Sequence, residues 1–121
     1  MKNISKEFLA EQEKACRIPC DAYLFALKNN NANIEKCQEV ACKEPDCAYY
    51  FAADIKGADI EYCQNMACKD PIYAYHFAKY IKGADIEYCQ KTTYKNIYWA
   101  RRFAEDIPGA DKKKYLIYSL L

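Results

Sequence analysis

The chain repeats itself every 26 residues, and this repetition constrains its fold more than any other feature. The ten-residue segment 55–64 (IKGADIEYCQ) recurs letter for letter at 81–90. Three apolar columns return at the same spacing: Ala22, Ala48, Ala74 and Ala100; Phe25, Phe51, Phe77 and Phe103; Ala26, Ala52, Ala78 and Ala104. A fixed period of this length is typical of stacked supersecondary units that bury their apolar faces against one another. The repeat therefore predicts the architecture, but the function only as a class.

Each repeat has the signals of two short helices. The only glycines recur at one repeat position: Gly57, Gly83 and Gly109. Asn31 holds that place in the first repeat, and both residue types tolerate the left-handed conformation that ends many helices, so we expect a helix to end at all four positions. Good N-caps follow two residues later: Asn33, Asp59, Asp85 and Asp111. Prolines mark the start of the other helix: Pro19, Pro45 and Pro71.

The second repeat illustrates the expected hairpin. Helix A is predicted over about 45–56 and helix B over about 59–68. Ala48, Phe51, Ala52 and Ile55 form one apolar stripe on helix A, at i, i+3, i+4 and i+7. The fold class predicted is all-α, an αα-hairpin repeat solenoid of about nine short helices.

One domain, 1–121, accounts for the whole chain. We expect an N-terminal capping half repeat over 1–15, with its helix capped by Ser5 or Asn3. Repeats follow over 16–41, 42–67 and 68–93, and a divergent C-terminal repeat over 94–121 ends in a helix from Asp111 to Leu121. Terminal repeats of a stack are expected to differ, because one side faces no neighbour.

Charge and hydropathy argue against several classes of protein. The formal net charge is +1, far from the strongly basic signature of nucleic-acid binders. No apolar run reaches the about 18 residues of a membrane span, so we expect no membrane partner. The N-terminal segment is charged and lacks the core of a signal peptide. A cytoplasmic protein is predicted.

Eight cysteines in a short chain raise the question of disulfides. Two columns hold six of them: Cys37, Cys63 and Cys89; Cys16, Cys42 and Cys68. Stacked helices lie about 8–10 Å apart, whereas a disulfide needs Cα atoms within about 7 Å, so same-column cysteines should not pair. We expect eight reduced thiols that serve as small buried residues. A disulfide or a metal site is the alternative, but the cysteines lack the C-x2-C spacing of zinc sites and there is one histidine. No metal and no cofactor are predicted.

Some positions of helix A vary among repeats whose framework is constant. The varying residues at i, i+3 and i+7 lie on one face, and from the second repeat onward they are mostly aromatic or cationic. We call six of them the strip, and predict that they bind a partner: Tyr50, Tyr73, His76, Tyr80, Trp99 and Arg102. Tyr, Trp and Arg are the types enriched at binding hot spots. Ordinary solvated or partly packed surface is the alternative interpretation.

Two constant columns are interpreted as structural. Tyr23, Tyr49 and Tyr75 are expected to pack one repeat on the next. Gln12, Gln38, Gln64 and Gln90 are expected to be buried amides that satisfy backbone groups. His76 has no Ser, Cys or second His at a motif spacing, so neither a catalytic nor a metal role is expected. The chain is predicted not to be an enzyme.

The repeated motif P-x-x-A-Y-x-F-A-x-x-I-K-G-A-D-I-E-x-C-Q resembles short tandem α-helical repeats of uncharacterised bacterial and bacteriophage proteins, over residues 16–110. It is not a tetratricopeptide match, since that period is 34 and its Trp-Leu-Gly-Tyr pattern is absent. The resemblance carries no catalytic residues to transfer.

Three functions follow from these observations. The first is a non-catalytic protein-binding module; by analogy with small phage proteins, it would act as an inhibitor of a host protein such as a defence nuclease. The second is a nucleic-acid binder that stacks bases on the aromatic and arginine side chains of the strip. The third, an enzyme or redox protein using the cysteines, has no supporting motif. The oligomeric state is left open.

Overall fold

The structure is a computed structural model that describes residues 4–119, with side chains described as far as residue 115. Every regular element in this part of the chain is a helix, and there are nine: α1 (Lys6–Ala15), α2 (Pro19–Lys28), α3 (Ile34–Ala41), α4 (Pro45–Asp54), α5 (Ile60–Ala67), α6 (Pro71–Tyr80), α7 (Ile86–Thr93), α8 (Ile97–Asp106) and α9 (Lys112–Ser119). Asn3 and the predicted end of the last helix at Leu121 lie outside the described residues.

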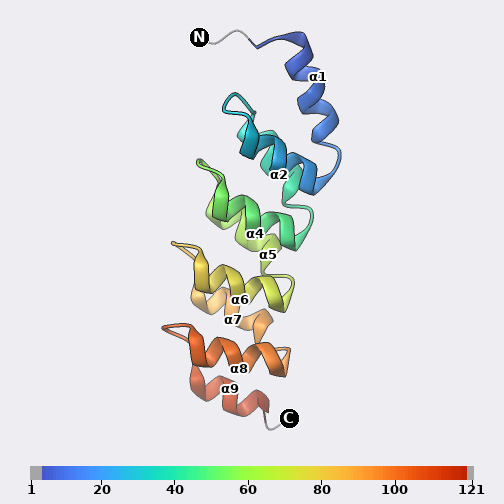
Figure 1. Cartoon of the computed structure of the whole chain (residues 1–121). Helices are drawn as coiled ribbons and strands as arrows, with labels where there is room; N and C mark the ends of the chain where they lie inside the picture. Colours follow the sequence, from blue (N-terminus) through green and yellow to red (C-terminus); the bar gives the residue numbers. More distant parts are fainter. Residues whose placement is uncertain (1–3, 120–121) are drawn as a thin grey trace.

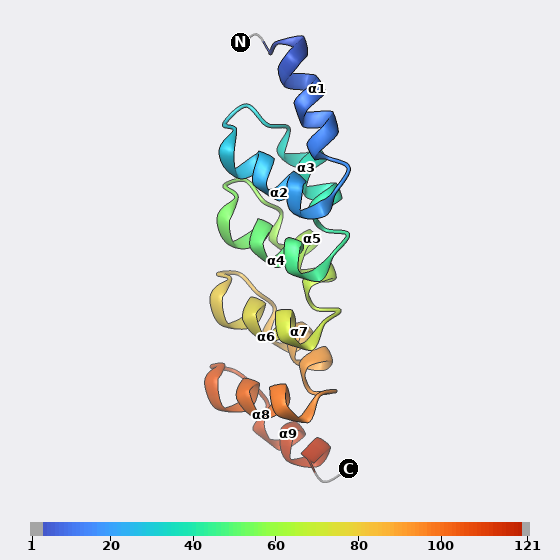
Figure 2. The same cartoon turned by 45° about the vertical axis from the view of Figure 1, so that its right-hand side comes forward.

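The helices stack in pairs along one axis, with the two ends of the chain at opposite ends of the stack (Figure 1). The even-numbered helices, here called A helices, pack each on the next: α2 on α4, α4 on α6, and α6 on α8. The odd-numbered helices are here called B helices. Helices α3, α5, α7 and α9 each pack beside the A helix of their own repeat, and α1 packs on α2, as Figure 2 shows from a second side. This arrangement confirms the predicted all-α solenoid of helix pairs.

Local sequence sets where the B helices begin. Asn33, Asp59 and Asp85 each accept a hydrogen bond from the backbone N–H three residues later, at 3.1 Å. Ser5 does the same for α1, also at 3.1 Å. Each cap satisfies an N–H that has no partner within its helix. The predicted N-caps of the B helices are therefore confirmed.

The A helices end earlier than the glycines predicted. Helix α4 ends at Asp54, and a turn follows in which the Ala58 N–H donates to the Ile55 carbonyl at 3.2 Å. Gly57 is the third residue of that turn and has φ 92°, as a type II turn requires. The equivalent glycines share this conformation, whereas Asn31 does not have a positive φ. Glycine here shapes the connection rather than the helix end.

The core is a continuous apolar layer between the A and B helices. The alanines at 22, 48, 74 and 100 are fully buried, which allows close approach of the helices. Phe51, Phe77 and Phe103 fill the remaining space and are equally inaccessible. Burying a phenylalanine side chain contributes about 1.5–3 kcal/mol. The predicted stripe of helix A therefore faces the core, although Ala52 is only half-buried.

The glutamine column joins each B helix to the next. The backbone N–H of Asp85, the N-cap of α7, donates to Gln64 Oε1 on α5 at 2.7 Å. Gln90 accepts in the same way from the N–H of Asp111 at 2.6 Å, and the earlier interfaces repeat the bond. Gln64 and Gln90 are only 6% and 4% exposed. These positions confirm the predicted buried amides, and leaving such an N–H unpaired would cost about 1–3 kcal/mol.

The cysteines depart from the expectation of eight free thiols. Cys20 on α2 and Cys47 on α4 form a disulfide, with Cα atoms 5.5 Å apart. They are 27 residues apart, one more than the repeat, so the argument against same-column pairing does not apply to them. The other six cysteines carry free thiols, and all except Cys16 are buried. A cytoplasmic location stays a prediction, and this bond weighs against it because disulfides persist mainly in oxidising compartments.

None of the helices between residues 4 and 119 combines the length and the apolar character needed to cross a bilayer.

Candidate partner-binding surface

Stacking of the A helices brings the strip together on one side of the molecule. Tyr50 lies on α4; Tyr73, His76 and Tyr80 lie on α6; Trp99 and Arg102 lie on α8. Because α4, α6 and α8 pack consecutively, residues three and four apart on each helix meet those of the next. Residues 30 or more apart in the sequence therefore form one surface.

Ring contacts connect the five ring-bearing residues of the strip without a gap. The centroids of Tyr50 and Tyr73 are 6.5 Å apart, and those of Tyr73 and His76 are 6.0 Å apart. From His76 the contacts branch to Tyr80 at 6.1 Å and to Trp99 at 6.0 Å. These spacings are those of favourable aromatic pairs.

Two cations lie over the rings. The guanidinium of Arg102 is 5.4 Å from the centroids of both Trp99 and Tyr75. The ammonium of Lys79 is 5.3 Å from the centroid of Tyr80 and 5.6 Å from that of Tyr75. Cation–π pairing of this kind contributes about 0.5–1 kcal/mol at exposed sites. It also orders long side chains that would otherwise move freely.

Sequence reasoning missed several members of this network. Tyr49 contacts Tyr50, Tyr73 and His76, although its column was assigned to packing alone. Tyr75 is 1% exposed and contacts His76 and Trp99, so it supports the strip from below. A constant column can thus pack between repeats and support a variable one. Lys79 was missed because no other repeat has a cation at its position.

Tyrosine hydroxyls connect neighbouring A helices, with one exception. The Tyr23 hydroxyl donates to the Asp54 carboxylate, from α2 to α4. The Tyr75 hydroxyl donates to Asp106 in the same way, from α6 to α8. At the middle interface the acceptor position is held by Tyr80, and among the described residues Tyr49 has no carboxylate acceptor.

Burial and these hydrogen bonds raise the pKa of both tyrosines. Burial and then the bond to Asp54 raise the pKa of Tyr23 to about 12. Burial, followed by the bond to Asp106, raises the pKa of Tyr75 as well. Both tyrosines are therefore neutral donors at physiological pH, and they serve as structural ties rather than as proton acceptors.

His76 lies at the centre of the strip and is neutral there. Burial lowers its pKa below the usual value, and the nearby cations Arg102 and Lys79 lower it further. Its ring contacts five others, from Tyr49, Tyr73, Tyr75, Tyr80 and Trp99. The imidazole packs as an aromatic ring in this setting.

The strip combines ordered rings with exposed edges. Tyr80 is 61% exposed and Tyr50 is 44% exposed, while the other four residues are half-buried. A partner that covered such a surface would lose little side-chain entropy, because the rings are already held by their neighbours.

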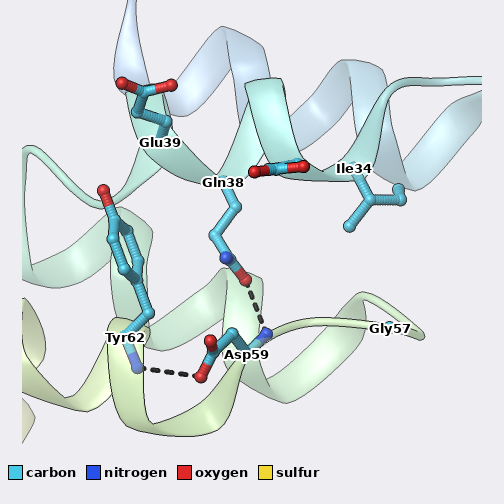
Figure 3. A pocket seen from close by; sticks show the side chains of 7 residues that line it. Ile34, Gln38, Glu39, Gly57, Asp59 and Tyr62 are labelled. Carbon is cyan, nitrogen blue, oxygen red and sulfur yellow. Dashed lines mark hydrogen bonds between the residues drawn. The ribbon is translucent and has the colours of Figure 1, made fainter.

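The B-helix side has one notable hollow, between the starts of α3 and α5 (Figure 3). Ile34, Gln38 and Tyr62 line it together with the carboxylates of Glu35, Glu39 and Asp59. Gln38 and Asp59 use their oxygens there to accept backbone N–H groups, at 2.6 Å and 3.1 Å. These two side chains therefore hold the start of α5 in place.

Within the described residues, the only cluster with spacing suitable for a metal ion is Cys20, Asp46 and Cys47. Both cysteine sulfurs of this cluster are used in the disulfide, so they are not available as thiolate ligands.

Comparison with protein-family models, with curated proteins and with solved structures finds no match. The class of the protein, an all-α solenoid of stacked helix pairs, is therefore defined by its own fold. The resemblance to bacterial and bacteriophage repeat proteins stays a prediction.

Proposed function

We propose that this protein is a non-catalytic binding module whose partner is another protein, held by the strip on the A helices. The observation that supports it is the unbroken ring network across α4, α6 and α8, with Arg102 and Lys79 stacked on it. Rigid aromatic anchors with an arginine are the usual composition of protein-binding hot spots.

The charges around the strip favour a protein over a nucleic acid. Arg102 is paired with Asp106 at 4.0 Å, and Asp54 lies at the Tyr50 end of the same face, where the Tyr23 hydroxyl binds it. Carboxylates among the rings would repel a phosphate backbone, whose neutralisation needs several unpaired cations. A protein partner with charges of both signs fits this mixture better.

Affinity capture followed by binding measurements tests the proposal. The immobilised protein is exposed to a lysate of its source cell, and both bound protein and bound nucleic acid are identified. Titration of the purified partner then compares the parent with Trp99→Ala and Arg102→Ala. We expect each change to weaken binding by about 2 kcal/mol, about 30-fold. The narrower expectation, that binding inhibits a host protein, stays a prediction that the partner's activity assay tests.

Tyr88→Ala provides the matched control. Tyr88 is an exposed tyrosine (39%) on the B helix α7, and it is not part of the strip. The Tyr88→Ala variant should bind the partner as the parent does. Because Trp99 also packs against the core, circular dichroism must show that its variant is folded, and Arg102→Ala serves as the variant with less effect on packing. Unchanged binding by both strip variants, or capture of nucleic acid alone, would reject the proposal.

A further inference from the structure

The three cysteine pairs outside the disulfide lie in contact across successive repeats. The Sγ atoms of Cys16 and Cys37 are 3.6 Å apart, those of Cys42 and Cys63 are 3.5 Å apart, and those of Cys68 and Cys89 are 3.1 Å apart. In each pair the first cysteine is the C-cap of one B helix, and the second lies one turn into the next. Together with Cys20 and Cys47, every cysteine of the chain thus has a cysteine neighbour.

The last repeat replaces both members of such a pair. The position of Cys16, Cys42 and Cys68 is held in the last repeat by Tyr94. The position of Cys37, Cys63 and Cys89 is held there by Tyr115. These two tyrosines contact one another, with ring centroids 6.4 Å apart. If cysteine served only as a small core residue, the two positions would be free to change separately, for instance to alanine in one of them.

We propose that these three pairs are oxidation sites, at which exchange with a low-molecular-weight disulfide such as oxidised glutathione forms a disulfide between consecutive B helices. One protein thiol gives up its proton, and its thiolate displaces one glutathione from the reagent. The partner thiolate then attacks the protein sulfur of the mixed disulfide and releases the second glutathione. The protein loses two hydrogens per bond, and one oxidised glutathione becomes two reduced ones.

In all three pairs the sulfur atoms already lie near bonding distance. A disulfide has its sulfurs about 2.05 Å apart, so each pair must close by about 1–1.5 Å, a movement within the range of side-chain rotation. The final state would join α1 to α3, α3 to α5, and α5 to α7, in addition to the existing link from α2 to α4. The spacing of the helices along the B side would then be fixed covalently. Helices α6 and α8, which carry five of the six strip residues, would have no link.

Burial sets the order in which the pairs react. Cys16 is the one partly exposed member, and the others are buried. Burial, reinforced by the contact with Cys16, raises the pKa of Cys37 to about 12. The contacts with Cys42 and Cys89 together with burial raise the pKa of Cys63 and of Cys68. Thiolate is the reactive form, so the pair at Cys16 closes first and the deeper pairs follow when the stack opens locally.

Mapping of the links during oxidation tests the proposal. Fully reduced protein is equilibrated with oxidised and reduced glutathione, quenched with acid, unfolded, alkylated, and digested for tandem mass spectrometry. We expect a complete loss of the eight labelled sites, through the links 16–37, 42–63, 68–89 and 20–47 alone. Six thiols that stay labelled at equilibrium, or links between other cysteines, would overturn the proposal. A deep pair that closes before 16–37 contradicts the proposed route.

A variant separates specific pairing from general thiol reactivity. Cys42→Ala should leave Cys63 as a single labelled thiol, with the three other links unchanged. Val40→Ala, a change in the same helix at a half-buried side chain, should keep all four links. Several alternative partners for Cys63 in the Cys42→Ala protein would overturn the assignment. Because the mapping of the parent chain needs no substitution, the proposal stays testable even if a variant fails to fold.

Discussion

Tyrosine has two different roles in this chain, and its position in the repeat decides which one. Tyr75 is buried and donates its hydroxyl across an interface to Asp106. Tyr80, five residues later, is among the most exposed large side chains of the described residues. The first position is tyrosine in three repeats, while the second is Lys28, Asp54, Tyr80 and Asp106 in turn. A single residue type can therefore be separated into framework and surface by comparing the repeats with one another.

Stability should depend on pH through His76. Burial and the nearby cations lower its pKa in the folded state, while the unfolded chain keeps a value of about 6.5. Between these two values the unfolded state binds more protons, so the stability present above about pH 6.5 is lost as the pH falls through this window. We expect the parent to lose more stability than His76→Gln between about pH 7.5 and about pH 5.5 in urea unfolding. Equal losses in the two proteins would contradict the assignment.

At the scale of elements, the sequence predicts the B helices better than the ends of the A helices. Asp59 and Asp85 could be identified as N-caps from the sequence because the cap is a local interaction, in which the side chain accepts a hydrogen bond from the backbone N–H three residues later. Gly57 was assigned to the helix end, yet α4 ends at Asp54. A glycine signal reports a positive φ and does not distinguish a helix end from the turn that follows it.

The sequence did not predict which two columns meet between successive repeats. The argument from sequence considered pairs within one column, such as Cys37 and Cys63. The distance between two such residues is the distance between neighbouring helices. The contacts of Cys37 are made instead with Cys16, in the other column. Which two columns meet depends on the offset between successive repeats, and that offset is set by packing and not by the period. The strip was predictable without knowledge of this offset. Its members lie on one face of each A helix, so stacking of these helices brings them together.

The turn glycines should be replaceable only at a conformational cost. A Cβ at Gly83 would meet no atom within 4 Å, but its φ is 92°. We expect Gly83→Ala to destabilise the fold by about 1 kcal/mol through backbone strain alone. Asn31, at the same repeat position, does not have a positive φ, so Asn31→Ala should leave the free energy of unfolding nearly unchanged. Chemical denaturation measures the free energy of unfolding of both variants. Equal losses in the two variants would show that the positive φ of Gly83 is not the cause of the destabilisation.

At the scale of the whole molecule, the interfaces between repeats are not equivalent. Every interface between described B helices has its glutamine bond, and the outer two A-helix interfaces also have a bond from tyrosine to aspartate. The middle interface, α4 on α6, lacks the carboxylate and has the exposed ring of Tyr80 instead. In a linear stack each interface contributes separately to stability, so this exchange weakens one joint at the centre of the strip. The molecule gives up a structural bond at the position where its proposed binding surface needs a ring.

This exchange predicts opposite effects on stability and on binding from one substitution. Tyr80→Asp would place a carboxylate where Asp54 and Asp106 lie at the neighbouring interfaces, within reach of the Tyr49 hydroxyl. We expect a gain of about 1 kcal/mol in the free energy of unfolding and a loss of partner binding, because the most exposed ring of the strip is removed. Tyr80→Ala removes the same ring without adding an acceptor, so it should lose binding without gaining stability. Denaturant unfolding of the parent and the two variants tests this prediction. If Tyr80→Asp is no more stable than Tyr80→Ala, the absence of a hydrogen bond from Tyr49 to a carboxylate does not weaken the middle interface.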